Sequence, residues 1–204
     1  LGDVYKRQVQ DGCDFMCSFC IIPFARGRSR HREFNNLCAE AAQQVASGLQ
    51  EIVLTGVNLG TYDLEGRNLV DVVDFLDSLK DLQRIRISSI EPTTVDPGLL
   101  ERMGDQSHKL VPFLHLPVQS GSNRILELMK RRYNALDYAR EVEEAILKIP
   151  DLCVGADVMV GFPGEGESEF TETLNLLANL PMSYLHVFPF SERAGTPATR
   201  LACL

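Results

Sequence analysis

The chain has 204 residues, 45% of them hydrophobic, which suits one domain with a substantial core. No apolar stretch is long enough to cross a bilayer and no apolar signal segment precedes the first cysteines, so we expect a cytoplasmic protein without membrane contact. The formal net charge of −8 argues against a surface that coats nucleic acid uniformly.

The two ends of the chain differ from the rest. The run from Asp3 to Gln8 reads like the translation of a transposon-adapter end from a sequencing library, and residues 202–204 are similar to the same adapter entered from the other side. We therefore expect residues 1–8 and 202–204 to be adapter-derived, and residues 9–201 to form the domain.

Strand-like and helix-like segments alternate along this domain. Segments rich in β-branched and aromatic residues predict strands at 9–11, 51–55, 84–90, 112–116, 152–160 and 183–190. Apolar residues at helical spacing and start signals such as Asn and Asp predict helices at 34–47, 69–79, 97–103, 123–130, 135–148 and 167–180. The alternation predicts an α/β fold with a parallel sheet covered by helices, whose ligands gather at the carboxyl ends of the strands.

Three cysteines follow the first predicted strand: Cys13, Cys17 and Cys20, in the spacing C-x3-C-x2-C. A [4Fe-4S] cluster is usually held by four thiolates, so three thiolates on one loop would leave one iron open to a small molecule. The spacing alone leaves two alternatives open, a structural zinc site completed by His31 and a set of inert or disulfide-bonded cysteines. No second ligand pair follows to favour zinc.

Polar and glycine-rich sequence follows the other strands. Glu91 and Gln119 each end a strand that points at the same cavity, although either could instead cap a helix. No G-x-G-x-x-G, P-loop or nucleophile elbow is present, which argues against nucleotide-binding Rossmann domains and hydrolases.

Several other reactive or charged residues have ordinary interpretations. His115 and His186 alternate with apolar neighbours, which is typical of barrel-lining histidines with satisfied hydrogen bonds rather than of ligands. Cys38 and Cys153 fall inside a helix and a strand, where cysteine is usually a small buried hydrophobe. The basic run at 130–132 is typical of a solvated helix end.

The cysteine spacing at the mouth of an α/β barrel resembles the radical S-adenosylmethionine (SAM) superfamily. More specifically, the chain resembles the central domain of the methylthiotransferases, and the forms LTGVNLG, SSIEP and HVFPFSERAGTPA are most similar to the branch that acts on threonylcarbamoyladenosine in tRNA. The resemblance implies a partial parallel (β/α)6 TIM-like barrel of the radical SAM type and argues against zinc. The motifs that carry it are QDGCDFMCSFCIIPFARGRSR, EIVLTGVNLGTY, RIRISSIEP, LHLPVQSGSNRILELMKRRY, DVMVGFPGE and HVFPFSERAGTPA.

The resemblance also implies the cofactors and their contacts. Cys13, Cys17 and Cys20 would hold a [4Fe-4S] cluster, and S-adenosyl-L-methionine would bind its open iron. The residues implied in cofactor binding are Phe19, Met159 and Gly161 beside adenine, Thr55, Gly56 and Asn58 near the methionine amino group, and Glu91 and Gln119 toward ribose or methionine.

The substrate implied by the resemblance is the anticodon loop of tRNA, with Arg26, Arg28 and Arg30 meeting its phosphates. Reductive cleavage of SAM, fed by an electron donor protein, would activate C2 of a hypermodified adenosine at position 37 for methylthiolation. A ribosomal-protein aspartate methylthiotransferase and a metal-stabilised binding module remain alternatives. Family members carry a second cluster on an N-terminal domain and an RNA-binding C-terminal domain, so we expect this chain alone to cleave SAM without thiolating tRNA.

Overall fold

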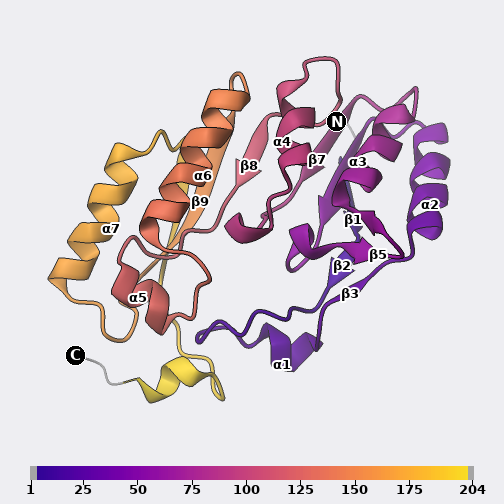
Figure 1. The fold of residues 1–204 in the computed structure, drawn as a ribbon. Helices are drawn as coiled ribbons and strands as arrows, with labels where there is room; N and C mark the ends of the chain where they lie inside the picture. The colour runs from indigo at the N-terminus through magenta and orange to yellow at the C-terminus, as the bar shows by residue number, and fades with distance from the viewer. Residues whose placement is uncertain (1–3, 202–204) are drawn as a thin grey trace.

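The computed structural model describes residues 4–201, and its framework is a row of parallel strands (Figure 1). Across these residues the strands follow the order β1-β4-β7 and then β8-β9-β10. Ile85 joins the two groups, because its N–H donates to Lys109 O at 2.8 Å and its carbonyl accepts from Val111 N at 2.9 Å. The strand bounds are β1 Val4–Gln8, β4 Glu51–Thr55, β7 Arg84–Ile87, β8 Phe113–His115, β9 Cys153–Val160 and β10 Tyr184–Pro189.

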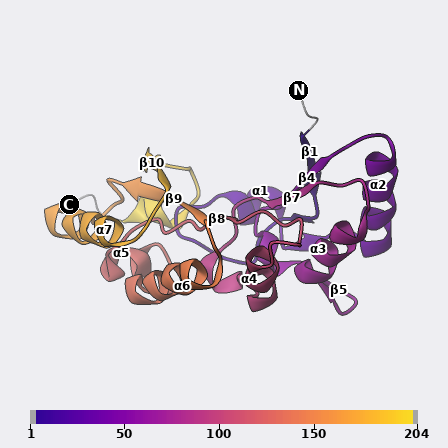
Figure 2. The same cartoon turned by 90° about the horizontal axis from the view of Figure 1, so that it is seen from above.

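Helices connect successive strands, and Figure 2 shows α3, α4 and α6 along the same side of the row. Asn68 and Asn134 begin α3 and α6 with capping boxes, each completed by an aspartate three residues later. No helix in the described part of the chain is long and apolar enough to span a bilayer. The helix bounds are α1 Ile22–Arg26, α2 Phe34–Ala46, α3 Leu69–Ser78, α4 Pro97–Gly104, α5 Asn123–Leu128, α6 Ala135–Lys148 and α7 Glu167–Asn179.

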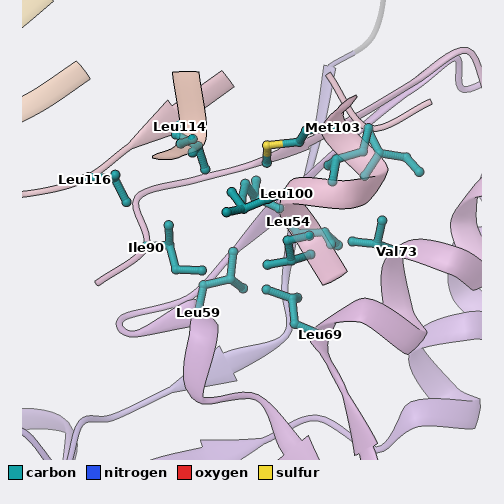
Figure 3. Close-up of a cluster of buried hydrophobic side chains, with 14 of the residues drawn as sticks. Leu54, Leu59, Leu69, Val73, Ile90, Leu100, Met103, Leu114 and Leu116 are labelled. Carbon is teal, nitrogen blue, oxygen red and sulfur yellow. The ribbon is translucent and has the colours of Figure 1, made fainter. Parts of the chain in front are cut away.

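The main hydrophobic core lies between the strands and these helices. Figure 3 shows Leu54 and Leu114, from strands, among side chains of α3 and α4 that include Val73 and Leu100. Because side chains alternate across a strand, residues next to core positions point to the opposite face of the sheet. That opposite face, here called the inner face, carries His115 and other polar groups.

The α/β class with parallel strands is confirmed, and β4 and α6 have the predicted bounds. The predicted strand at 84–90 is too long, because β7 ends at Ile87. The strand predicted at 9–11 corresponds to β2 (Gln10–Asp11), but it pairs antiparallel with β3 (Arg30–His31) and does not join the parallel row. The antiparallel pair of β5 (Asp63–Leu64) with β6 (Arg67–Asn68) was not predicted.

The first strand corrects the prediction at the N-terminus. Strand β1 occupies Val4–Gln8, within the segment that we excluded from the fold, and pairs in parallel with β4. Backbone groups can pair with an open strand edge whatever the side chains are, and the buried Arg7 is accommodated by Glu40 at 3.3 Å. The adapter origin of the ends stays a prediction, and residues 1–3 and 202–204 lie outside the described residues.

Candidate active site

The cysteine loop begins with a turn that only glycine can make. Gly12 has φ +71°, and a Cβ at this position would lie 2.0 Å from the carbonyl oxygen of Arg28. Directly after it, the N–H of Cys13 donates to Gly27 O at 3.1 Å. The loop therefore folds back on its own C-terminal end and presents its cysteines on one short segment.

The three cysteines are free and half-buried. Burial raises the pKa of Cys13 and of Cys20, and the neighbouring thiols add to both shifts. The three thiols therefore lie close enough to one another to interact electrostatically.

The position of His31 argues against the zinc alternative. Its Nε2 lies 3.0 Å from Ser29 Oγ, and its Nδ1 contacts the carbonyl oxygen of Asp63. Both ring nitrogens therefore have partners other than the cysteines.

Gln10 ties the cysteine loop to the turn that follows β4. Its Nε2 donates to Gly12 O at 2.7 Å, and its Oε1 accepts from Asn58 N at 2.8 Å. Gly56 lies so close that a Cβ there would be 3.0 Å from Gln10 Oε1. The predicted segment from Thr55 to Asn58 is thus brought against the loop. This role of Gln10 could not be predicted, because a single glutamine in a short strand gives no periodic signal in the sequence.

Ser18 fixes the opposite side of the loop. It is 2% exposed, and its Oγ donates to Leu128 O at 2.6 Å while its N–H donates to Met129 O at 3.0 Å. Its carbonyl oxygen accepts from Ala198 N at 2.8 Å. The loop is therefore held between the end of α5 and the 3-10 turn Pro197–Arg200.

Arg131 contacts the cysteine loop and corrects the prediction that the basic run at 130–132 is solvated. It is buried, not solvated, and its Nη2 donates to both Glu91 carboxylate oxygens at 2.6 and 2.7 Å. Its Nη1 lies 3.3 Å from Cys17 Sγ, and its guanidinium covers the ring of Tyr133. The Glu91 carboxylate is thus engaged by Arg131, and its contact with ribose or methionine stays a prediction. The neighbouring side chains of Lys130 and Arg132 are exposed, as expected.

Phe19 and Met159 line one surface pocket, together with Cys20 and Phe188. Phe19 also makes an edge-to-face contact with Phe162, with ring centroids 6.4 Å apart. The structure therefore brings together two of the residues assigned to adenine and places them next to the loop cysteine Cys20.

Gln119 and Gly161 both have left-handed backbone. Gln119 has φ +66°, and its N–H and carbonyl bond to Asp157 O at 2.9 Å and Met159 N at 2.8 Å. A non-glycine residue in this region is costly and is often found at functional sites. Gly161 has φ +70° and open space around its Cα, so backbone conformation explains the glycine there.

The three candidate RNA-binding arginines are exposed but differ in their partners. Arg26 and Arg30 both contact the carboxylate of Asp11, the former at 3.1 Å. Arg28 lines a surface pocket with Cys13 and Phe24. Asp11 therefore neutralises part of the charge that the sequence assigned to phosphate binding.

The chain is similar in sequence to two kinds of tRNA-modifying enzyme. It is 44% identical over 197 residues to the threonylcarbamoyladenosine tRNA methylthiotransferase MtaB of Bacillus subtilis, covering 95% of this chain and 44% of that protein. It is 40% identical over 190 residues to the tRNA-2-methylthio-N(6)-dimethylallyladenosine synthase of Cereibacter sphaeroides, covering 93% and 43%. The chain spans less than half the length of these relatives.

The fold is similar to that of a solved radical SAM methyltransferase, TsrM from Kitasatospora setae, whose structure holds cobalamin and a [4Fe-4S] cluster. The TM-score is 0.78 at 17% identity, covering 97% of this chain and 38% of that chain, and this likeness concerns the fold alone. Residues 8–177 match the Radical SAM superfamily, which confirms the resemblance inferred from the motifs. The chain belongs to the radical SAM superfamily.

Proposed function

We propose that this chain is the radical SAM core of a tRNA methylthiotransferase that activates C2 of a hypermodified adenosine at position 37. The observation that carries the proposal is the loop with Cys13, Cys17 and Cys20, which offers three free thiols at the mouth of a radical SAM fold. Relatives at 44% and 40% identity are named as enzymes that methylthiolate tRNA, which supports this substrate class.

In this proposal the three loop thiolates hold a [4Fe-4S] cluster, and S-adenosyl-L-methionine binds the iron that lacks a protein ligand. When bound, the two cofactors supply radical chemistry through reductive cleavage of SAM. The chain contributes placement: Gln10 and Ser18 fix the loop, and Arg131 donates to the sulfur of Cys17. Phe19 and Met159 offer an apolar wall for adenine beside Cys20.

The remaining site residues stay predictions of the same proposal. The turn at Thr55, Gly56 and Asn58 lies against the cysteine loop through Gln10, which supports its assignment to the methionine amino group. The half-buried Gln119 and the exposed Gly161 border the β9 end that carries Met159. An electron donor protein and the tRNA anticodon loop complete the cytoplasmic reaction.

The direct test is anaerobic reconstitution of the chain with iron, sulfide and reductant, followed by iron analysis and mass spectrometry of 5′-deoxyadenosine. We expect about four irons per chain and cleavage of SAM. Cys17→Ala should lose both, because two thiolates do not hold the cluster.

The matched control is Cys38→Ala, which removes a buried thiol of α2 away from the loop. It should load iron like the unsubstituted chain. Full iron content in Cys17→Ala, or stoichiometric zinc in a colourless protein, would contradict the proposal. Mass analysis of tRNA and of ribosomal proteins incubated with the full-length enzyme separates the two methylthiotransferase alternatives.

A further inference from the structure

Two histidines and an aspartate meet on the inner face of the sheet, away from the cysteine loop. His115 on β8, Asp157 on β9 and His186 on β10 occupy three neighbouring parallel strands. Asp157 Oδ1 lies 3.0 Å from His115 Nε2 and 3.3 Å from His186 Nδ1. The three ligand atoms all lie within 4.8 Å of one another, and no other such group of His, Cys, Asp or Glu occurs among residues 4–201.

A tyrosine fixes the orientation of the first histidine. The hydroxyl of Tyr184 lies 2.9 Å from His115 Nδ1, the ring nitrogen that faces away from Asp157. When Tyr184 accepts a hydrogen bond from Nδ1–H, Nε2 carries a lone pair directed at the carboxylate. A lone pair and a carboxylate oxygen 3.0 Å apart need a cation or a proton between them.

The backbone is shaped to admit this tyrosine. Gly155 on β9 lies under the Tyr184 ring, and a Cβ at Gly155 would lie 2.0 Å from the ring atom Cζ. Any larger residue would push the ring aside and move the hydroxyl from His115. The arrangement therefore depends on a specific glycine, a tyrosine and a histidine from three adjacent strands.

The cluster is accessible from the inner face. The side chain of His115 is 9% exposed and that of Asp157 28%, but that of His186 is 55% exposed. Met159 and Phe188, the next same-face residues on β9 and β10, line the pocket that contains Phe19 and Cys20. The cluster thus lies one step along the strands from the candidate active site and opens toward solvent.

We propose that His115, Asp157 and His186 bind a divalent transition-metal ion of the zinc class, at a site separate from the cysteine loop. Two imidazoles and one carboxylate are a common ligand set for such ions, which then keep open positions for water or substrate. The hydrogen bond that the Nδ1–H of His115 donates to the Tyr184 hydroxyl is the kind of contact that orients a metal-binding histidine. Mg²⁺ and Ca²⁺ fit less well, because they prefer oxygen ligands.

The test uses the 204-residue chain with all three loop cysteines changed to Ser, so that the loop offers no thiolate. Anaerobic titration with Co²⁺ should give one bound ion per chain with visible ligand-field bands, and Zn²⁺ should displace it. Asp157→Asn and His186→Ala should each abolish the bands. Tyr184→Phe should weaken Co²⁺ binding about 10- to 100-fold, since it removes only the orienting contact.

His31→Ala is the matched control, because the hydrogen-bond partners of His31 are Ser29 and Asp63 and not the proposed ligands. This variant should bind Co²⁺ as tightly as the chain without it. Circular dichroism checks that each variant is folded, and the same histidine and aspartate variants in the cysteine-intact chain should lose one equivalent of bound Zn²⁺. If no Co²⁺ bands appear, or if they survive Asp157→Asn and His186→Ala, the three residues do not bind a metal ion and form only a hydrogen-bond network. Co²⁺ binding is measured without the loop cysteines and without SAM, so a negative result would leave the proposed function standing.

Discussion

The guanidinium of Arg131 contacts both a buried carboxylate and the sulfur of Cys17. Its side chain is 5% exposed and that of Glu91 is 13% exposed, so both charges have lost most of their hydration. The net stabilisation from such a pair is small, but removing one partner strands the other charge and costs about 3–5 kcal/mol. Through Arg131, the segment after β7 that carries Glu91 is thus connected to Cys17, a candidate ligand of the iron–sulfur cluster.

We expect Arg131→Met to lower the free energy of unfolding by about 3–5 kcal/mol, because Glu91 is left buried without a countercharge. The double variant Arg131→Met with Glu91→Gln should recover part of that loss. Urea denaturation measures both. The control is Arg102→Met, whose partner Asp74 is 44% exposed, and we expect it to cost about 0–1 kcal/mol. Equal losses in the two single variants would contradict a special role for the buried pair.

At the scale of elements, helix α7 makes a buried polar contact with the loop after β8. Thr173 is the buried residue of this helix, at 3% exposure. Its Oγ1 accepts from Gly121 N at 2.9 Å and lies 3.2 Å from Ser120 Oγ. Gly121 permits the approach, since a Cβ there would lie 2.6 Å from the Cα of Thr173. The helix is therefore docked by a close backbone contact and a buried hydroxyl, beside Leu176 and Leu177, which pack against the main core.

Thr173→Val keeps the shape of the side chain but leaves the N–H of Gly121 buried without an acceptor. We expect a loss of about 1–3 kcal/mol in the free energy of unfolding and faster hydrogen exchange at the Gly121 amide. Thr171→Val is the matched control, because Thr171 makes the same bond to the carbonyl four residues earlier but is exposed. We expect it to stay within about 0.5 kcal/mol. Similar losses in both variants would show that helix propensity, not docking, decides the outcome.

Much of the framework was predictable because it depends on local patterns. Strand β4 centres on the apolar run Ile52, Val53 and Leu54, and α6 has a capping box at Asn134 with regular apolar spacing, so both elements follow from sequence. Strand β1 was missed because residues 1–8 were set aside as adapter-derived, and an edge strand pairs through its backbone, which the side-chain pattern does not reveal.

The candidate site was likewise predictable where it depends on a local motif and not where it depends on long-range contacts. The cysteines form a local motif, whereas the contacts of Arg131 with Glu91 and of His115 with Asp157 join residues about 40 positions apart. Such pairs have no spacing rule, so the basic run at 130–132 looked solvated and the two histidines looked independent. The polar sequence at each strand end showed that the site lies at the carboxyl ends of the strands, but it did not show which side chains meet there.

At the scale of the whole molecule, charge is distributed unevenly. The chain carries a formal net charge of −8, yet Arg26, Arg28 and Arg30 gather just after the cysteine loop. Asp11 contacts Arg26 and Arg30, so Arg28, beside Cys13 at a surface pocket, becomes the arginine of this group best suited to a phosphate. RNA would thus bind locally at the arginines beside the cysteine loop, while the net negative charge of the rest of the chain repels its phosphates.

We therefore expect Arg28→Gln to weaken the binding of unmodified tRNA and to reduce the slope of log K against log salt by about one, because one phosphate contact is lost. Arg140→Gln makes the same change of net charge on α6 and should leave the slope unchanged. Asp11→Asn should act in the opposite direction, since it releases Arg26 and Arg30 toward the RNA. Filter binding across a salt series measures all three variants. If Arg28→Gln and Arg140→Gln shift the affinity equally and neither alters the slope, the arginines beside the cysteine loop are solvated surface charges and tRNA is bound elsewhere on the full-length enzyme.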